Sequence, residues 1–134
     1  METLNSHSLM LGDWIKLPQQ APYSLATVDE INDEGCFADG WSLPNGEIQP
    51  VLLTTEILEK NGFEKKKISD YKSLFCIVSQ NYDYLYVSWI GIPEFGIGSS
   101  FDEDDELQEF ATIRYVHELQ HALRLCGIEK EIEL

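Results

Sequence analysis

The chain of 134 residues has the length of one domain and is long enough to bury a hydrophobic core without disulfide or metal staples. Its 24 acidic residues against nine basic ones give a net charge of −15, which disfavours direct binding to nucleic acid and to anionic membrane surfaces. A basic protein partner suits this charge, and so does simple solubility.

Three cysteines, Cys36, Cys76 and Cys126, are far apart and form no C-x-x-C pair, so they indicate neither a disulfide framework nor a zinc knuckle. Free thiols are typical of a reducing compartment. The first residues lack the basic and apolar regions of a signal peptide, and no apolar run reaches the length of a transmembrane helix. We therefore expect a cytoplasmic protein with no membrane partner.

The first half of the chain predicts short strands. The polar residues 1–8 are expected to be disordered. Strand candidates follow, with a hairpin signal at Asn45-Gly46, and lie at residues 9–17, 23–31, 36–43 and 48–53. Four short strands at close spacing predict a strongly bent, barrel-like antiparallel sheet over residues 9–53, loosely of the Src-homology-three (SH3-like) type.

A short capped helix is expected after this sheet. Thr54 and Thr55 are placed to cap a helix over residues 56–61, and Gly62 is placed to end it in the left-handed region. The only basic run, residues 65–67, is interpreted as a solvated turn.

A hairpin and a closing helix complete the predicted fold. Residues 71–79 and 82–90 have strong β preference and are expected to pair through a tight turn. Residues 91–100 are rich in Gly and Ser and predict a loop or an irregular edge. An amphipathic helix within residues 111–126 then packs on the sheet and stops at Gly127. The predicted fold is one α+β domain over residues 1–134, with the strands at 9–53 and the helix, hairpin and helix at 54–134.

His117, Glu118 and His121 spell H-E-x-x-H on the predicted closing helix, which is the signature of zinc metallopeptidases. In such a site two His at i and i+4 bind one metal, and the Glu acts as general base on the bound water. A zinc-dependent hydrolase is therefore one alternative function.

Two observations weigh against a zinc site. The histidines lie roughly 160° from the centre of the apolar stripe of the helix, beside Arg114 and Arg124, so we expect them to be exposed to solvent. A catalytic zinc also needs a third protein ligand, and only the acidic residues of the tail follow His121. An upstream ligand within the acidic run 102–106 stays open. We predict no catalytic residues, no metal and no cofactor.

The second strand of the hairpin places tyrosines on one face. Tyr82, Tyr84 and Tyr86 share that face, while Leu85 and Val87 share the other. A row of aromatic hydroxyl groups is a candidate contact surface for a partner protein. A buried or dimer-covered face is the alternative.

Three segments resemble a known family. They are residues 9–15 (LMLGDWI), 50–64 (PVLLTTEILEKNGFE) and 113–127 (IRYVHELQHALRLCG). In this order and spacing they resemble small proteins of gut Bacteroidetes, often encoded in prophage-like or mobile elements. The family pattern ends in Y-V-H-x-L-Q-N-L, with Asn at the position of His121. The resemblance implies that the H-E-x-x-H spelling is particular to this chain, and it implies no catalytic residues.

Together these observations predict a non-enzymatic protein-binding or accessory protein, belonging to a phage or mobile element, with a homodimer as a further option. The first alternative is an acidic mimic of DNA that occupies the basic groove of a nuclease or regulator, which requires carboxylates gathered on one elongated face. The second alternative is the zinc hydrolase.

Overall fold

The computed structural model describes residues 3–18, 21, 24–69, 72–78, 84–91, 94–100, 108–128 and 130–134. The chain divides into two compact units: an N-terminal unit of Met1–Val51 with Tyr115–His117, and a C-terminal unit of Leu52–Arg114 with Glu118–Leu134. Antiparallel sheets and few helices confirm the α+β class. The boundary after Val51 lies near the predicted end of the strand-rich part, and the single-domain organisation stays a prediction.

In the part of the N-terminal unit that the structure describes, the strands form two three-stranded antiparallel sheets, in the orders β2-β1-β6 and β3-β4-β5. Their strands are β1 (Trp14–Lys16), β2 (Leu25–Thr27), β3 (Glu30–Asn32), β4 (Gly35–Ala38), β5 (Trp41–Pro44) and β6 (Gln49–Pro50). The described strands form no closed barrel, so the barrel-like and SH3-like arrangement is not confirmed.

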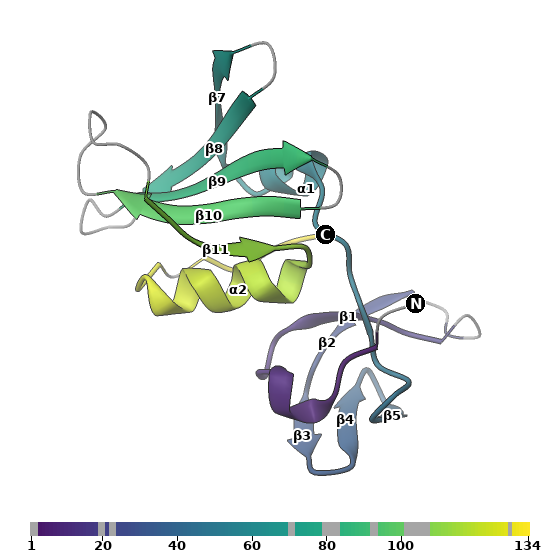
Figure 1. The fold of residues 1–134 in the computed structure, drawn as a ribbon. Helices are drawn as coiled ribbons and strands as arrows, with labels where there is room; N and C mark the ends of the chain where they lie inside the picture. The colour runs from purple at the N-terminus through teal and green to yellow at the C-terminus, as the bar shows by residue number, and fades with distance from the viewer. Residues whose placement is uncertain are drawn as a thin grey trace. The chain divides into compact units, whose positions relative to one another are not determined.

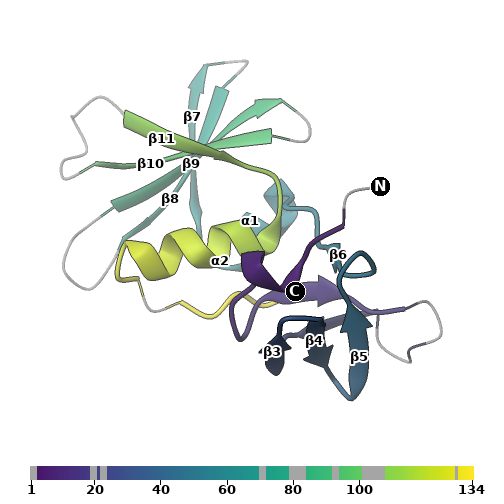
Figure 2. The same cartoon turned by 60° about the horizontal axis from the view of Figure 1, so that its bottom comes forward.

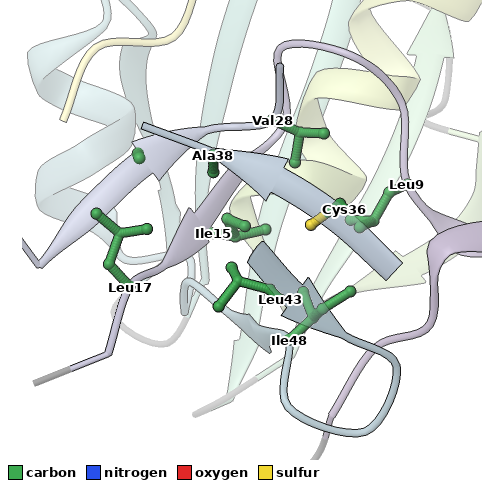
Figure 3. Close-up of a cluster of buried hydrophobic side chains, with 9 residues drawn as sticks. Leu9, Ile15, Leu17, Val28, Cys36, Ala38, Leu43 and Ile48 are labelled. Atoms are coloured by element: carbon green, nitrogen blue, oxygen red, sulfur yellow. The ribbon is translucent and has the colours of Figure 1, made fainter. Parts of the chain in front are cut away.

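One hydrophobic core serves both sheets. In β4, Cys36 and Ala38 are buried while Phe37 between them is exposed, which is the alternation expected of a strand with one covered face. Figure 3 shows the core side chains converging from several strands; the cluster consists of Leu9, Ile15, Leu17, Ala26, Val28, Cys36, Ala38, Leu43 and Ile48.

Two turns differ from the sequence prediction. Residues 36–43 form two strands because Asp39 and Gly40, with φ of 48° and 79°, make a tight hairpin turn between β4 and β5. Positive φ at both central positions fits the twist of paired strands. The turn at Asn45-Gly46 exists, but it connects β5 to β6, which belong to different sheets. The hairpin predicted there is therefore wrong.

Residues 3–8 make hydrogen bonds with each other and with distant residues of the N-terminal unit, and the disorder expected of residues 1–8 stays a prediction. A 3₁₀ helix, η1 (Ser6–Ser8), is capped by Asn5, whose side chain accepts a hydrogen bond from the His7 N–H. The N–H of Leu4 donates to the carbonyl of Ile48, and the N–H of Ser6 donates to Asn45 Oδ1. These partners lie far along the chain, so local polarity alone could not predict them.

The described residues of the C-terminal unit form a five-stranded antiparallel meander and two helices. Its sheet order is β11-β10-β9-β8-β7, and α2 (Val116–Leu125) runs along one face of the sheet (Figures 1 and 2). The strands fan out in Figure 2, as expected of a twisted sheet. The remaining elements are α1 (Thr55–Lys60), β7 (Glu64–Ser69), β8 (Lys72–Val78), β9 (Tyr84–Gly91), β10 (Glu94–Ser100) and β11 (Gln108–Ile113).

The first helix and the hairpin are confirmed. Thr54 caps α1 by accepting a hydrogen bond from the Ile57 N–H at 3.3 Å, and Gly62 follows the helix with φ of 84°. The strands β8 and β9 pair antiparallel as predicted, whereas the turn expected between them lies outside the described residues. Gly127, with φ of 71°, ends α2 as predicted.

Three segments of the C-terminal unit have a different secondary structure from the one that the sequence predicts. The basic run 65–67 lies in the edge strand β7, where Lys residues are common because they oppose pairing with other chains. Residues 94–100 form β10 inside the sheet. This glycine-rich segment has little strand preference of its own, but its backbone pairs with β9 on one side and β11 on the other. Residues 108–113 form β11, so the closing helix starts only at Val116.

Within the described residues, no helix is long and apolar enough to cross a membrane.

Candidate functional site

Glu118 of the H-E-x-x-H segment takes part in capping the helix. Its Oε1 accepts a hydrogen bond from the backbone N–H of Arg114 at 2.9 Å, two residues before α2 begins. A carboxylate in the first turn also interacts favourably with the helix dipole. The Arg114 guanidinium pairs with the Glu94 carboxylate of β10, and both side chains are partly exposed. Glu118 thus has a structural partner at the start of α2.

His117 is buried, contrary to the expectation that both histidines face solvent. Only 4% of the residue is exposed, and its ring stacks on Tyr115 with centroids 5.8 Å apart and planes inclined by 12°. His121, one turn later, is half-buried. Residues 115–117 belong to the N-terminal unit and the rest of α2 to the other unit. The apolar periodicity of the helix predicts the face turned to the sheet and does not predict the burial of His117.

No group of three or more His, Cys, Asp or Glu side chains that could hold a metal ion occurs among the described residues. The acidic run 102–106 and Glu129, which were considered as ligands, lie outside that part of the chain. Among the described residues, the two histidines therefore have no third side chain beside them that would complete a zinc site.

The tyrosine face of β9 is covered where it can be observed. Tyr86 is buried, and so are Leu85, Val87 and Ser88, so both faces of the strand are packed at these positions. Tyr82 and the side chain of Tyr84 lie outside the described part. The observation at Tyr86 favours the buried alternative over a contact surface.

Burial makes Cys36 an unreactive thiol. Desolvation raises the pKa of Cys36 above its ordinary value, which lowers the thiolate fraction on which nucleophilic attack depends. The described cysteines are all free, and Cys76 is also buried. Neither buried thiol has the solvent exposure of a catalytic cysteine.

The turn at residues 10–13 of the N-terminal unit displays two apolar side chains, and no functional motif in the sequence indicates it. Residues 10–13 close a β-turn in which the Asp13 N–H donates to the Met10 carbonyl at 3.1 Å. Gly12, with φ of 87°, supplies the positive φ that a type II turn needs at its third position. Leu11 is 60% exposed and Met10 is 43% exposed, whereas the preceding Leu9 points into the core.

Buried Asp13 holds this turn in place. Its Oδ2 accepts a hydrogen bond from the Met10 N–H at 2.8 Å. The backbone of Val28 pairs with the turn on both sides, accepting from the Gly12 N–H and donating to the Asp13 carbonyl, each at 2.9 Å. The two exposed side chains are therefore carried by a backbone with several fixed points. The only sequence signal was the Leu-Met-Leu-Gly-Asp run, which also fits a plain turn.

Carboxylates accumulate in the β3–β5 region of the same unit. Between residues 29 and 47 the chain has six acidic residues and no basic one. All six are exposed, on the strands or in the connecting turns; they are Asp29, Glu30, Asp33, Glu34, Asp39 and Glu47. Phe37, 37% exposed on the outer side of β4, is the cross-strand neighbour of Glu30. The region is thus acidic with an apolar side chain among the charges.

Comparison with protein-family models, with curated proteins and with solved structures gave no match. The resemblance to the small proteins of gut Bacteroidetes therefore stays a prediction.

Proposed function

We propose that the protein is a non-enzymatic accessory protein that binds another protein, and that the Met10–Leu11 turn of its N-terminal unit is the main contact. The supporting observation is the fixed backbone under two exposed apolar side chains. Holding contact residues in place before binding lowers the entropic cost of association, and a few well-placed side chains supply most of the affinity. Met also adapts its shape to a partner surface.

The charge of the unit indicates the chemistry of the partner. Residues 1–51 contain one Lys and eight Asp or Glu, which gives a net charge of 1 − 8 = −7. A partner with a basic surface around an apolar pocket would match both the carboxylates and the exposed side chains, and opposite charges would speed the encounter. The proposal includes a cytoplasmic location, which the free cysteines support, and a phage or mobile-element source, which only the family resemblance supports.

Recovery of partners with matched variants tests this function. Affinity purification from the native host compares three tagged chains: the wild type, a Met10→Ser/Leu11→Ser double variant and a Leu125→Ser control. Leu125 is a suitable control because it is 87% exposed at the end of α2, in the other unit. We expect a partner that the wild type and the control retain and the double variant loses. Equal recovery by all three would refute the assigned contact.

A DNA mimic is the second candidate, and the carboxylates at residues 29–47 favour it. Such a protein would occupy a basic groove, so its binding should weaken steeply with salt and duplex DNA should displace it. Binding held mainly by the apolar turn should weaken only modestly with salt, and duplex DNA should not displace it. A salt titration of the recovered complex, with and without competing DNA, separates the two candidates.

A further inference from the structure

Asn61, at the end of α1, makes a two-point contact with the backbone of a distant segment. Its Nδ2 donates to the Glu133 carbonyl at 2.8 Å, and its Oδ1 accepts from the Glu133 N–H at 2.7 Å. Nδ2 also donates to the Ile57 carbonyl at 2.8 Å, which accepts the backbone N–H of Asn61 as well, at 3.1 Å. Asn61 is only 2% exposed, so its amide is buried with both donors and its acceptor engaged.

This contact recognises Glu133 by its backbone and not by its side chain. The residue lies in the irregular segment 130–134 and is itself exposed, while its N–H and C=O both point to one amide. The preceding Ile132 is buried, with 4% exposed. Main-chain hydrogen bonds that give affinity, together with a pocket for a neighbouring side chain that gives selectivity, are the components of extended-peptide recognition.

We propose that Asn61 forms a peptide-binding site in the C-terminal unit, occupied in this structure by the chain's own segment 130–134, and that the same segment of a second copy can replace it. The ligand is an extended peptide with an aliphatic residue before the clamped position. The covalently attached segment competes at a high effective concentration, so a single chain keeps its own segment bound and exchange requires a high concentration of the other copy.

Two full-length variants at position 133 test the site. Glu133→Pro removes the N–H that Asn61 accepts, whereas Glu133→Ala removes only an exposed side chain and keeps both backbone groups. A fluorescent peptide with the sequence of residues 127–134 is titrated into each variant and followed by anisotropy. We expect about fivefold tighter binding to the proline variant, because its own segment loses roughly 1 kcal/mol of binding free energy and competes less well for the site.

A matched peptide and the wild-type chain complete the test. A peptide with Pro in place of Glu133 should bind the proline variant about fivefold more weakly than the unmodified peptide does. In the wild-type chain, saturating unmodified peptide should speed hydrogen exchange of the Glu133 amide. Equal binding to the two variants, no binding to either, or exchange that the peptide leaves unchanged would each overturn the proposal. None of these outcomes depends on the Met10–Leu11 turn, so this site and the proposed function fail independently.

Discussion

Asp13, Asn45 and Asn61 show how single polar side chains fix the path of this chain. Asn45 accepts from the Ser6 N–H and donates to the Asp33 carbonyl at 2.9 Å, so it joins two segments that precede it. Asn61 holds a residue 72 positions away. Each was predictable as a turn or helix-end residue, because Asn and Asp favour such places. Their distant partners were not, because nothing local in the sequence specifies them.

At Asp13 we predict that Asp13→Ala destabilises the chain by about 1–3 kcal/mol, because the Met10 N–H loses its acceptor inside a partly buried turn. Asp13→Asn keeps an acceptor oxygen and should cost clearly less. Urea denaturation of both variants measures the difference. Equal losses would show that the negative charge of Asp13, and not the hydrogen bond to Met10, stabilises the turn.

Cys36 should resist alkylation in the folded chain. Because burial raises the pKa of its thiol, Cys36 stays protonated at pH values where an exposed thiol begins to ionise. We expect it to react about ten times more slowly than the half-buried Cys126 at pH 8, as measured by mass spectrometry with iodoacetamide. The same shift stabilises the fold below the ordinary thiol pKa, and this contribution is lost as the pH rises above it. Similar rates at both cysteines would contradict the burial.

Local signals located some elements and missed others. The cap at Thr54 and the stops at Gly62 and Gly127 are confirmed because caps and left-handed glycines act within one turn of the helix. Strand β10 was missed because its glycines carry no pattern, and its pairing with β9 and β11 decides its conformation. The Asp39-Gly40 pair is itself a hairpin-turn signal, although the sequence prediction has a single strand over residues 36–43.

For helix α2 we predict that Glu118→Ala costs about 1 kcal/mol, because the side chain accepts the Arg114 N–H at the start of the helix. Glu118→Gln should stay within about 0.5 kcal/mol of the wild type, since its carbonyl oxygen can accept the same hydrogen bond. Chemical denaturation provides both values. A loss for Gln as large as that for Ala would show that capping is not the role of Glu118.

In strand β4, Gly35 allows a close approach of the neighbouring strand. A Cβ at this position would lie 2.1 Å from the backbone oxygen of Leu43 in β5, too close for either strand to keep its place. We expect Gly35→Ala to destabilise the chain by about 2–3 kcal/mol, toward the upper end for an overpacked site. An exposed control on the same strand is Phe37→Ser. A thermal shift no larger than that of the control would contradict this packing.

At the scale of the whole molecule, the sequence predicted the α+β class, whereas it did not predict the surroundings of the candidate site residues. The H-E-x-x-H spelling drew attention to His117 and Glu118, which are a buried ring and a helix cap. Strand alternation drew attention to Tyr86, which is buried because β9 lies inside a sheet packed at that point on both faces. Alternation separates the two faces of a strand, but it does not tell how many of them are covered.

Met10 and Leu11 differ from the sequence expectation in the opposite direction, because their apolar side chains are exposed. An apolar run next to a core residue predicts burial, and only the turn fixed by Asp13 and Val28 places these two side chains in solvent. Exposed apolar residues occur singly on most proteins, whereas Met10 and Leu11 are adjacent, lie on a fixed backbone and belong to a unit of charge −7.

Site-specific photo-crosslinking in the native host tests the proposed contact most directly. A photoreactive leucine analogue is placed at position 11 in one chain and at position 125, which is even more exposed, in another. The account predicts a crosslink from position 11 to one partner protein, at a site beside Lys or Arg residues, and none to that partner from position 125. No crosslinked protein from position 11, or the same set of proteins from both positions, would contradict it.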